Sequence, residues 1–115
     1  MLVVSGARRA FVGTAAALLI GSVSAAPAVH TVTIDGFEFH PAELTVSKGD
    51  VVVWVNKDPV PHTATAQRAA TAQRAAFDSG SIAAGGSFRF TANGVGRFDY
   101  ICTLHPTMKG ALIVR

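Results

Sequence analysis

The 115-residue chain is half apolar and only 15% charged, a composition that excludes intrinsic disorder and suits one packed domain. Its formal charge of +3 falls to about +1 without Arg8 and Arg9, because eight Lys and Arg then face seven Asp and Glu. With so small a charge and no cluster of basic residues, the chain lacks the electrostatic footprint of a nucleic-acid-binding protein.

The first 25 residues have the three parts of an export signal. Two arginines give a positive start, residues 11–20 form a short apolar segment, and residues 23–25 (VSA) have the small-x-small pattern that precedes a cut. We therefore expect residues 1–25 to be removed and residues 26–115 to form a domain in the periplasm or another exported compartment. An uncleaved anchor is the alternative, although the segment is short for a span of about 20 residues. The arginine pair also resembles a twin-arginine signal, so the folded and unfolded export routes both stay open.

Short alternating segments separated by Gly and Pro predict an all-β domain. Residues 29–34 alternate apolar and polar side chains, and Phe37 and Phe39 extend the same period of two. Further strands are expected at residues 44–46, 51–56, 87–91, 97–102 and 111–114. About seven to eight short strands of this kind indicate a Greek-key β-sandwich.

A tandem repeat interrupts the strand pattern, because residues 64–69 and 70–75 both read ATAQRA. Six residues are too few for a solenoid unit, so we interpret the repeat as a duplication within a surface connection. Ala, Gln and Arg favour helix, and a turn or two of helix is expected there. A basic docking knob formed by Arg68 and Arg74 is the alternative interpretation.

The strand at residues 97–102 determines which way the sole cysteine points. Phe98, Tyr100 and Cys102 share one face because side chains alternate along a strand. If the two rings face the core, Cys102 faces it too, at the end of the strand. An exported chain with one cysteine cannot form an intramolecular disulfide, so this thiol is either inert or committed to chemistry.

The pattern Cys102-x-x-His105-x-x-Met108 brings together the sole cysteine and the sole methionine outside the signal. Thiolate, imidazole and thioether are together typical of a redox-active copper ion. A plane of two His and one Cys with a distant axial Met needs a second imidazole. His62 is the best candidate, because the prolines before it stiffen the segment that presents it.

Less specific interpretations of the same residues stay open. His62 and His105 could be ordinary loop histidines, and Cys102 could be an apolar filler. His30 and His40 invite a second metal site, but we expect them to be surface histidines.

Two further pairs of residues have structural interpretations. Trp54 and Tyr100 are expected to pack in the core rather than to relay electrons. Asn56 and Asp58 are expected to organise the turn before Pro59.

Several segments resemble the plastocyanin and amicyanin branch of the cupredoxins, and together they extend over residues 29–115. They are FEFHPAELTVSKGDVVVWVNKDPVPH at residues 37–62, FDSG at 77–80, SFRFT at 87–91 and YICTLHPTMKG at 100–110. The two-residue gap between His105 and Met108 resembles that of amicyanin. The resemblance implies a cupredoxin-like Greek-key sandwich.

The resemblance also implies one type 1 copper ion, bound by the imidazoles of His62 and His105, the thiolate of Cys102 and, weakly, Met108. Many relatives carry Asn directly after the first His ligand, where this chain has Thr63. A hydroxyl at that position could still join the ligand loops by hydrogen bonding, with a different influence on the metal.

The function implied is one-electron transfer between transient redox protein partners by a monomer that is not an enzyme. Once the signal is cleaved, no stable membrane association is expected. A copper chaperone or buffer of the same fold is the main alternative. A small copper enzyme would need further His-rich motifs than four histidines supply, and a sandwich without metal would be separated by metal analysis.

Overall fold

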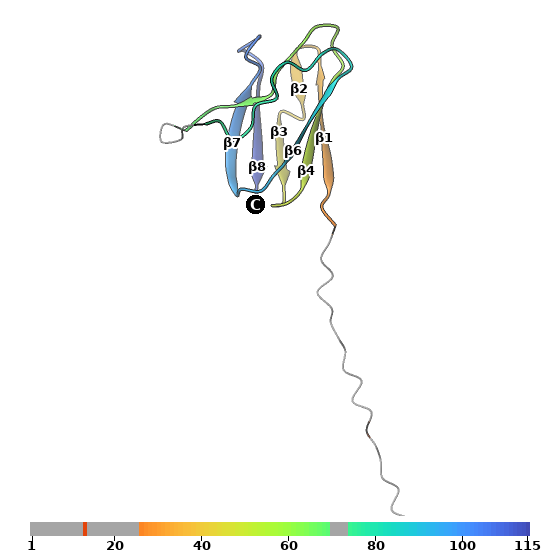
Figure 1. Cartoon of the computed structure of the whole chain (residues 1–115), viewed down its shortest axis with the longest axis vertical. Helices are drawn as coiled ribbons and strands as arrows, with labels where there is room; N and C mark the ends of the chain where they lie inside the picture. The colour runs from red at the N-terminus through yellow and green to blue at the C-terminus, as the bar shows by residue number, and fades with distance from the viewer. Residues whose placement is uncertain (1–12, 14–25, 70–73) are drawn as a thin grey trace, which may run out of the picture.

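The computed structural model describes residues 13, 26–69 and 74–115, and within them it contains eight strands and no helix. The strands are β1 (Val29–Asp35), β2 (Glu38–His40), β3 (Glu43–Val46), β4 (Val51–Asn56), β5 (Thr65–Ala66), β6 (Ser87–Thr91), β7 (Gly96–Ile101) and β8 (Lys109–Val114). They form the sandwich of Figure 1, which confirms the predicted all-β class. Apart from one residue, the predicted signal at 1–25 lies outside the described residues.

Two four-stranded sheets make up the sandwich, in the orders β2-β1-β4-β6 and β3-β8-β7-β5. Each sheet combines one parallel pair, β1 with β4 or β3 with β8, with antiparallel neighbours. Because the chain passes repeatedly from one sheet to the other, connections that are distant in sequence meet at the same end of the sandwich.

Aromatic side chains fill the space between the sheets. Trp54 on β4 is fully buried, and its ring meets that of Tyr100 on β7 at 90° with centroids 5.5 Å apart. Phe98, two residues before Tyr100 on β7, packs against the same core. Cys102, directly after β7, is fully buried, so the predicted inward face of Phe98, Tyr100 and Cys102 is confirmed.

The prediction that Phe37 continues the alternation of β1 is wrong. Asp35 pairs with Glu38, so Gly36 and Phe37 form a two-residue hairpin turn, with φ angles of 61° and 60°. Phe39 returns to the core, whereas Phe37 is 47% exposed. The reversal of the chain at Gly36 breaks the period of two.

The first copy of the ATAQRA repeat, residues 64–69, lies wholly within the described residues and does not form the expected helix. Thr65 and Ala66 form β5, which pairs with β7, and the Ala66 amide donates to the Phe77 carbonyl at 2.9 Å. Pairing with an existing sheet outweighs the intrinsic helix propensity of the repeat, because tertiary context readily overrides propensity. Residues 70–73 of the second copy lie outside the described residues.

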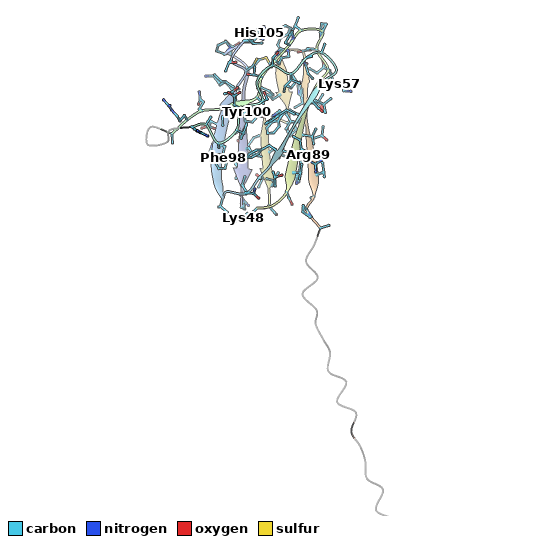
Figure 2. All side chains as sticks on the ribbon, viewed as in Figure 1. Lys48, Lys57, Arg89, Phe98, Tyr100 and His105 are labelled. Carbon is cyan, nitrogen blue, oxygen red and sulfur yellow. The ribbon has the colours of Figure 1, made fainter. Side chains whose placement is uncertain are left out.

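The two ends of the sandwich differ in what they carry. The Lys48 amide donates to the carbonyl of the C-terminal Arg115, so this turn and the chain end lie together. His105 lies at the opposite end (Figure 2). Within the described ranges, no helix is long and apolar enough to cross a membrane.

Candidate metal centre

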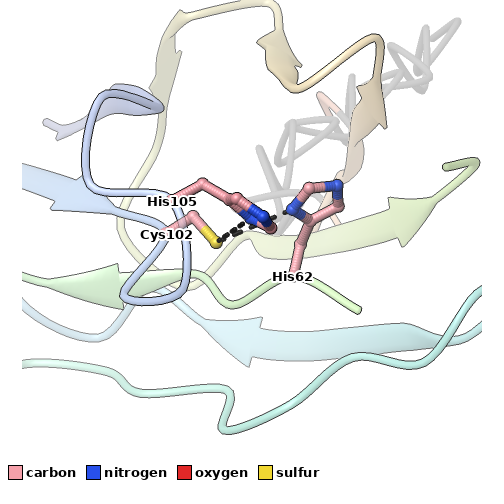
Figure 3. Close-up of side chains that lie close together, drawn as sticks. All are labelled: His62, Cys102 and His105. Atoms are coloured by element: carbon pink, nitrogen blue, oxygen red, sulfur yellow. Dashed lines mark hydrogen bonds between the residues drawn. The ribbon is translucent and has the colours of Figure 1, made fainter. Parts of the chain in front are cut away.

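Three of the four predicted ligands meet at the end of the sandwich that carries His105. The Sγ atom of Cys102 lies 3.7 Å from Nδ1 of His62 and 3.7 Å from Nδ1 of His105 (Figure 3). The three donor atoms all lie within 4.8 Å of one another. His62 and Cys102 are fully buried, whereas His105 is partly exposed.

The fourth predicted ligand, Met108, ends a tight loop that begins at Cys102. Cys102 and Met108 are joined by a 3.1 Å bond from the Cys102 amide to the Met108 carbonyl. Inside the loop, the His105 amide donates to the Cys102 carbonyl at 3.2 Å and the Met108 amide donates to the His105 carbonyl at 2.9 Å. Met108 is 3% exposed, so the loop keeps both sulfur-bearing residues inside while His105 reaches the surface.

Backbone pairing fixes the segment that presents His62. The His62 amide donates to the Ile82 carbonyl at 3.1 Å, and the Ile82 amide donates back at 2.7 Å. The side-chain amide of Asn56, at the end of β4, donates to the carbonyls of Val60 and Ile82 at 2.8 and 3.0 Å. Asn56 therefore organises this turn as predicted, and it also anchors the turn to the neighbouring segment.

The Asp58 carboxylate reaches beyond its own turn to His62. Its Oδ2 lies 2.8 Å from His62 Nε2. Burial raises the pKa of Asp58, but hydrogen bonds from the Phe37 and Gly36 amides, together with His62, outweigh that effect and hold the pKa below its ordinary value. An ionised carboxylate can only accept, so Nε2 carries the ring proton and Nδ1 presents its lone pair to the thiol.

The sulfur of Cys102 also receives a hydrogen bond from the backbone. The Thr63 amide donates to Sγ at 3.3 Å. An amide donor of this kind stabilises negative charge on sulfur, as a thiolate ligand requires. The strand parity in the sequence located Cys102 correctly, but it carried no signal for this contact between residues 39 positions apart.

Sequence reasoning missed the position of Phe37 in the site. Its ring meets the imidazoles of His62 and His105 edge-on, with centroids 5.1 and 5.0 Å away and interplanar angles of 88° and 87°. Leu104, next to His105, is 54% exposed. Phe37 and Leu104 thus form part of an apolar rim around His105. Gly36, a turn-forming residue, was the sequence signal that could have separated Phe37 from the strand.

The other two histidines do not join the cluster. His30 Nε2 lies 2.9 Å from Asp50 Oδ2 near the start of β1. The side chain of His40 is 53% exposed, as expected for a surface histidine. Of the residues described, one group of His, Cys and acidic side chains has metal-binding geometry, and it consists of His62, Cys102 and His105.

The donor chemistry of this cluster fits a type 1 copper ion. Two imidazole nitrogens and a thiol converge, and a buried thioether residue ends the same loop. A β-sandwich with this donor set defines the cupredoxin class. A family model for copper-binding proteins of the plastocyanin/azurin family matches residues 26–115, and the chain belongs to that family.

Several amicyanins are similar to this chain. Amicyanin-alpha of Methylorubrum extorquens is 31% identical over 116 residues, which cover 98% of this chain and 97% of that protein. Amicyanin of Paracoccus versutus is 31% identical over 83 residues, which cover 72% of this chain but only 62% of that protein.

Solved structures show the same likeness. The Cu(I) form of an amicyanin mutant superimposes with a TM-score of 0.70 at 27% identity, over 80% of this chain and 87% of that one. A copper-containing nitrite reductase from Thermus scotoductus gives a TM-score of 0.69 at 28% identity, over 79% of this chain. The match covers only 23% of the reductase, so it extends to a fraction of that enzyme.

Proposed function

We propose that the protein is an exported one-electron carrier in which His62, Cys102, His105 and Met108 hold a single copper ion. A copper ion bound there supplies the one-electron couple between Cu(II) and Cu(I). The observation that carries this proposal is the convergence of a buried thiol and two imidazoles in a member of a copper-binding family. The small share of the nitrite reductase that matches supports a carrier rather than an enzyme.

The protein's part in electron transfer is to keep the ligands from moving. His62 is fixed by its paired bonds to Ile82, and the Cys102–Met108 loop is closed by three backbone bonds. Both segments belong to a packed sandwich whose core resists rearrangement. A donor set held in this way suits both oxidation states and keeps the structural cost of changing between them small.

The apolar rim around His105 supplies a surface for transient partners. His105 is partly exposed, Leu104 is 54% exposed and Phe37 is 47% exposed. Brief contact with redox proteins needs only a small interface of this kind. We further propose that the mature protein is a monomer without stable membrane association after removal of residues 1–25.

The test is to express the full chain in an export-competent host, purify the exported protein and add Cu(II). We expect an intense blue colour for the wild type and none for Cys102→Ser. The mass of the purified protein reports whether residues 1–25 have been removed. A folded wild-type protein that stays colourless with Cu(II) contradicts the copper site.

A copper buffer with the same ligands is distinguished by kinetics. A carrier exchanges electrons rapidly between its oxidised and reduced forms and retains copper against a chelator. Slow self-exchange, measured by NMR line broadening in mixed samples, together with rapid copper loss would favour the buffer.

A further inference from the structure

We propose that Asp58 is a positioning residue of the copper site. Its carboxylate fixes the orientation of the His62 ring and the position of the Phe37 side chain, which covers the imidazoles of His62 and His105. This inference rests on the proposed copper site. It adds a residue that does not touch the metal, and it joins the β1–β2 turn to the ligand set.

The Asp58 carboxylate forms hydrogen bonds with three residues, Gly36, Phe37 and His62. Oδ2 lies 2.8 Å from His62 Nε2 and accepts the Phe37 amide at 2.9 Å, while Oδ1 accepts the Gly36 amide at 2.8 Å. Asp58 is 6% exposed and His62 is fully buried, so water competes little for these bonds. Two consecutive amides and one imidazole thus share one anion.

The bond to His62 fixes the ligand chemically as well as sterically. It keeps the ring proton on Nε2, prevents rotation of the ring and leaves Nδ1 directed at the Cys102 sulfur. A carboxylate partner also makes the imidazole a more basic ligand. A more basic ligand favours the more highly charged oxidation state, so Asp58 should lower the reduction potential.

The bonds to the turn hold Phe37 in a backbone conformation that large side chains avoid. Its φ of 60° is in the left-handed region, and the two amides bound by Asp58 belong to this turn. In that position the ring contacts His62 and His105 edge-on. Loss of the carboxylate should therefore loosen the cover over His105 as well as the ring of His62.

The chain contains a matched control at the other end of the sandwich. Asp50 accepts the amides of Ala28 and Ser47 at 3.1 and 3.0 Å and bonds His30 Nε2 at 2.9 Å. It therefore repeats the pattern of two amides and one imidazole around a largely buried carboxylate, but its histidine is not a proposed ligand. Asp50→Asn measures the general cost of losing such an anion.

The experiment compares wild type, Asp58→Asn, Asp58→Glu and Asp50→Asn, each expressed from the full chain and purified as the exported protein. A carboxamide at position 58 has one acceptor oxygen and must direct its NH₂ group at one or more of the three N–H donors. Asp58→Asn therefore removes the charge and cannot keep all three hydrogen bonds. We expect its copper affinity to fall about 10- to 100-fold and its reduction potential to rise. Asp58→Glu keeps the charge and should recover part of both values.

A measurement without copper separates the proposal from the proposed function. In the metal-free protein, Asp58→Asn should speed hydrogen exchange at the Gly36 and Phe37 amides and change the ¹⁵N shifts of the His62 ring, whereas Asp50→Asn should do neither. If wild type gives no blue site, the proposed function fails. If wild type is blue but Asp58→Asn matches Asp50→Asn in affinity, potential and exchange, the role of Asp58 alone is refuted.

Discussion

The Thr63 hydroxyl accepts a hydrogen bond from the Thr103 amide at 2.8 Å and lies 3.1 Å from the Thr103 hydroxyl. Each threonine directly follows a proposed ligand, His62 or Cys102, so this pair joins the two ligand loops. Thr63 stands where many relatives carry Asn, and the hydroxyl bonds across the loops as the sequence suggested.

Replacing Thr63 with Val should destabilise the metal-free protein, because the Thr103 amide would lose its acceptor. Thr103 is exposed, so water can replace part of this bond, and we expect a loss of about 0.5–1.5 kcal/mol, the net contribution of one hydrogen bond. Urea unfolding followed by tryptophan fluorescence measures the change. Thr63→Ser keeps the hydroxyl and should stay close to wild type, and an equal loss in both variants would count against the inter-loop bond.

Gly110→Ala should destabilise the fold through a clash in the core. A Cβ atom at Gly110 would lie 2.3 Å from Cζ and 2.4 Å from the hydroxyl oxygen of the buried Tyr100. We expect a loss of about 1–3 kcal/mol or more in thermal or urea unfolding, as is typical of overpacked cores. Gly94→Ala is the control, because its Cβ would make only an ordinary contact, 3.9 Å from Cζ of Phe98. Similar stability of the two variants would refute the close packing.

The hydroxyl of Tyr100 should ionise at a higher pH than that of an exposed tyrosine. Burial raises the pKa of Tyr100 to about 12, although Trp54 offsets part of the effect. The chain has one tyrosine, so ultraviolet absorbance reports this group alone. The unfolded chain releases the proton at lower pH than the folded one, so stability should fall as pH rises from about 10 towards 12. Ionisation near pH 10 in the folded state would show that the ring is not buried.

Stability should also fall in acid, in part through Asp50. Its hydrogen bond with His30, followed by that from the Ser47 amide, holds the pKa of Asp50 below its ordinary value. The unfolded chain therefore takes up the proton first, and the contribution of Asp50 is present above its ordinary pKa and lost as pH falls through the lower folded value. Urea unfolding of the metal-free protein at a series of acidic pH values should show a shallower decline for Asp50→Asn than for wild type. Parallel declines would contradict this assignment.

The regular strands could be predicted from the sequence because each depends on a local pattern. Alternation located β1 and β6, a run of β-branched and aromatic residues located β4, and the period of two in β7 predicted that Cys102 faces inward. The short β5 was missed because its Thr65 and Ala66 pair through contacts with β7 that no local pattern records.

The cluster of His62, Cys102 and His105 was predictable because sulfur and imidazole are rare and chemically specific donors. The residues that hold these ligands in place could not be predicted from the sequence. Asp58 acts on Gly36 and Phe37, more than twenty residues away, and only the closed sandwich brings them within hydrogen-bonding distance. The i, i+4 spacing of Asp58 and His62 was the one local sign of that role.

The separation of the chain end from the metal centre has a practical consequence. Arg115 is bonded to the Lys48 turn, and His105 lies at the far end of the sandwich (Figure 2). A thiol-bearing tag added after Arg115 should therefore attach the protein to a gold electrode with its copper end directed away from the metal surface. By the same geometry, a reductase domain fused after Arg115 would leave the copper end of the sandwich accessible for electron exchange with a partner.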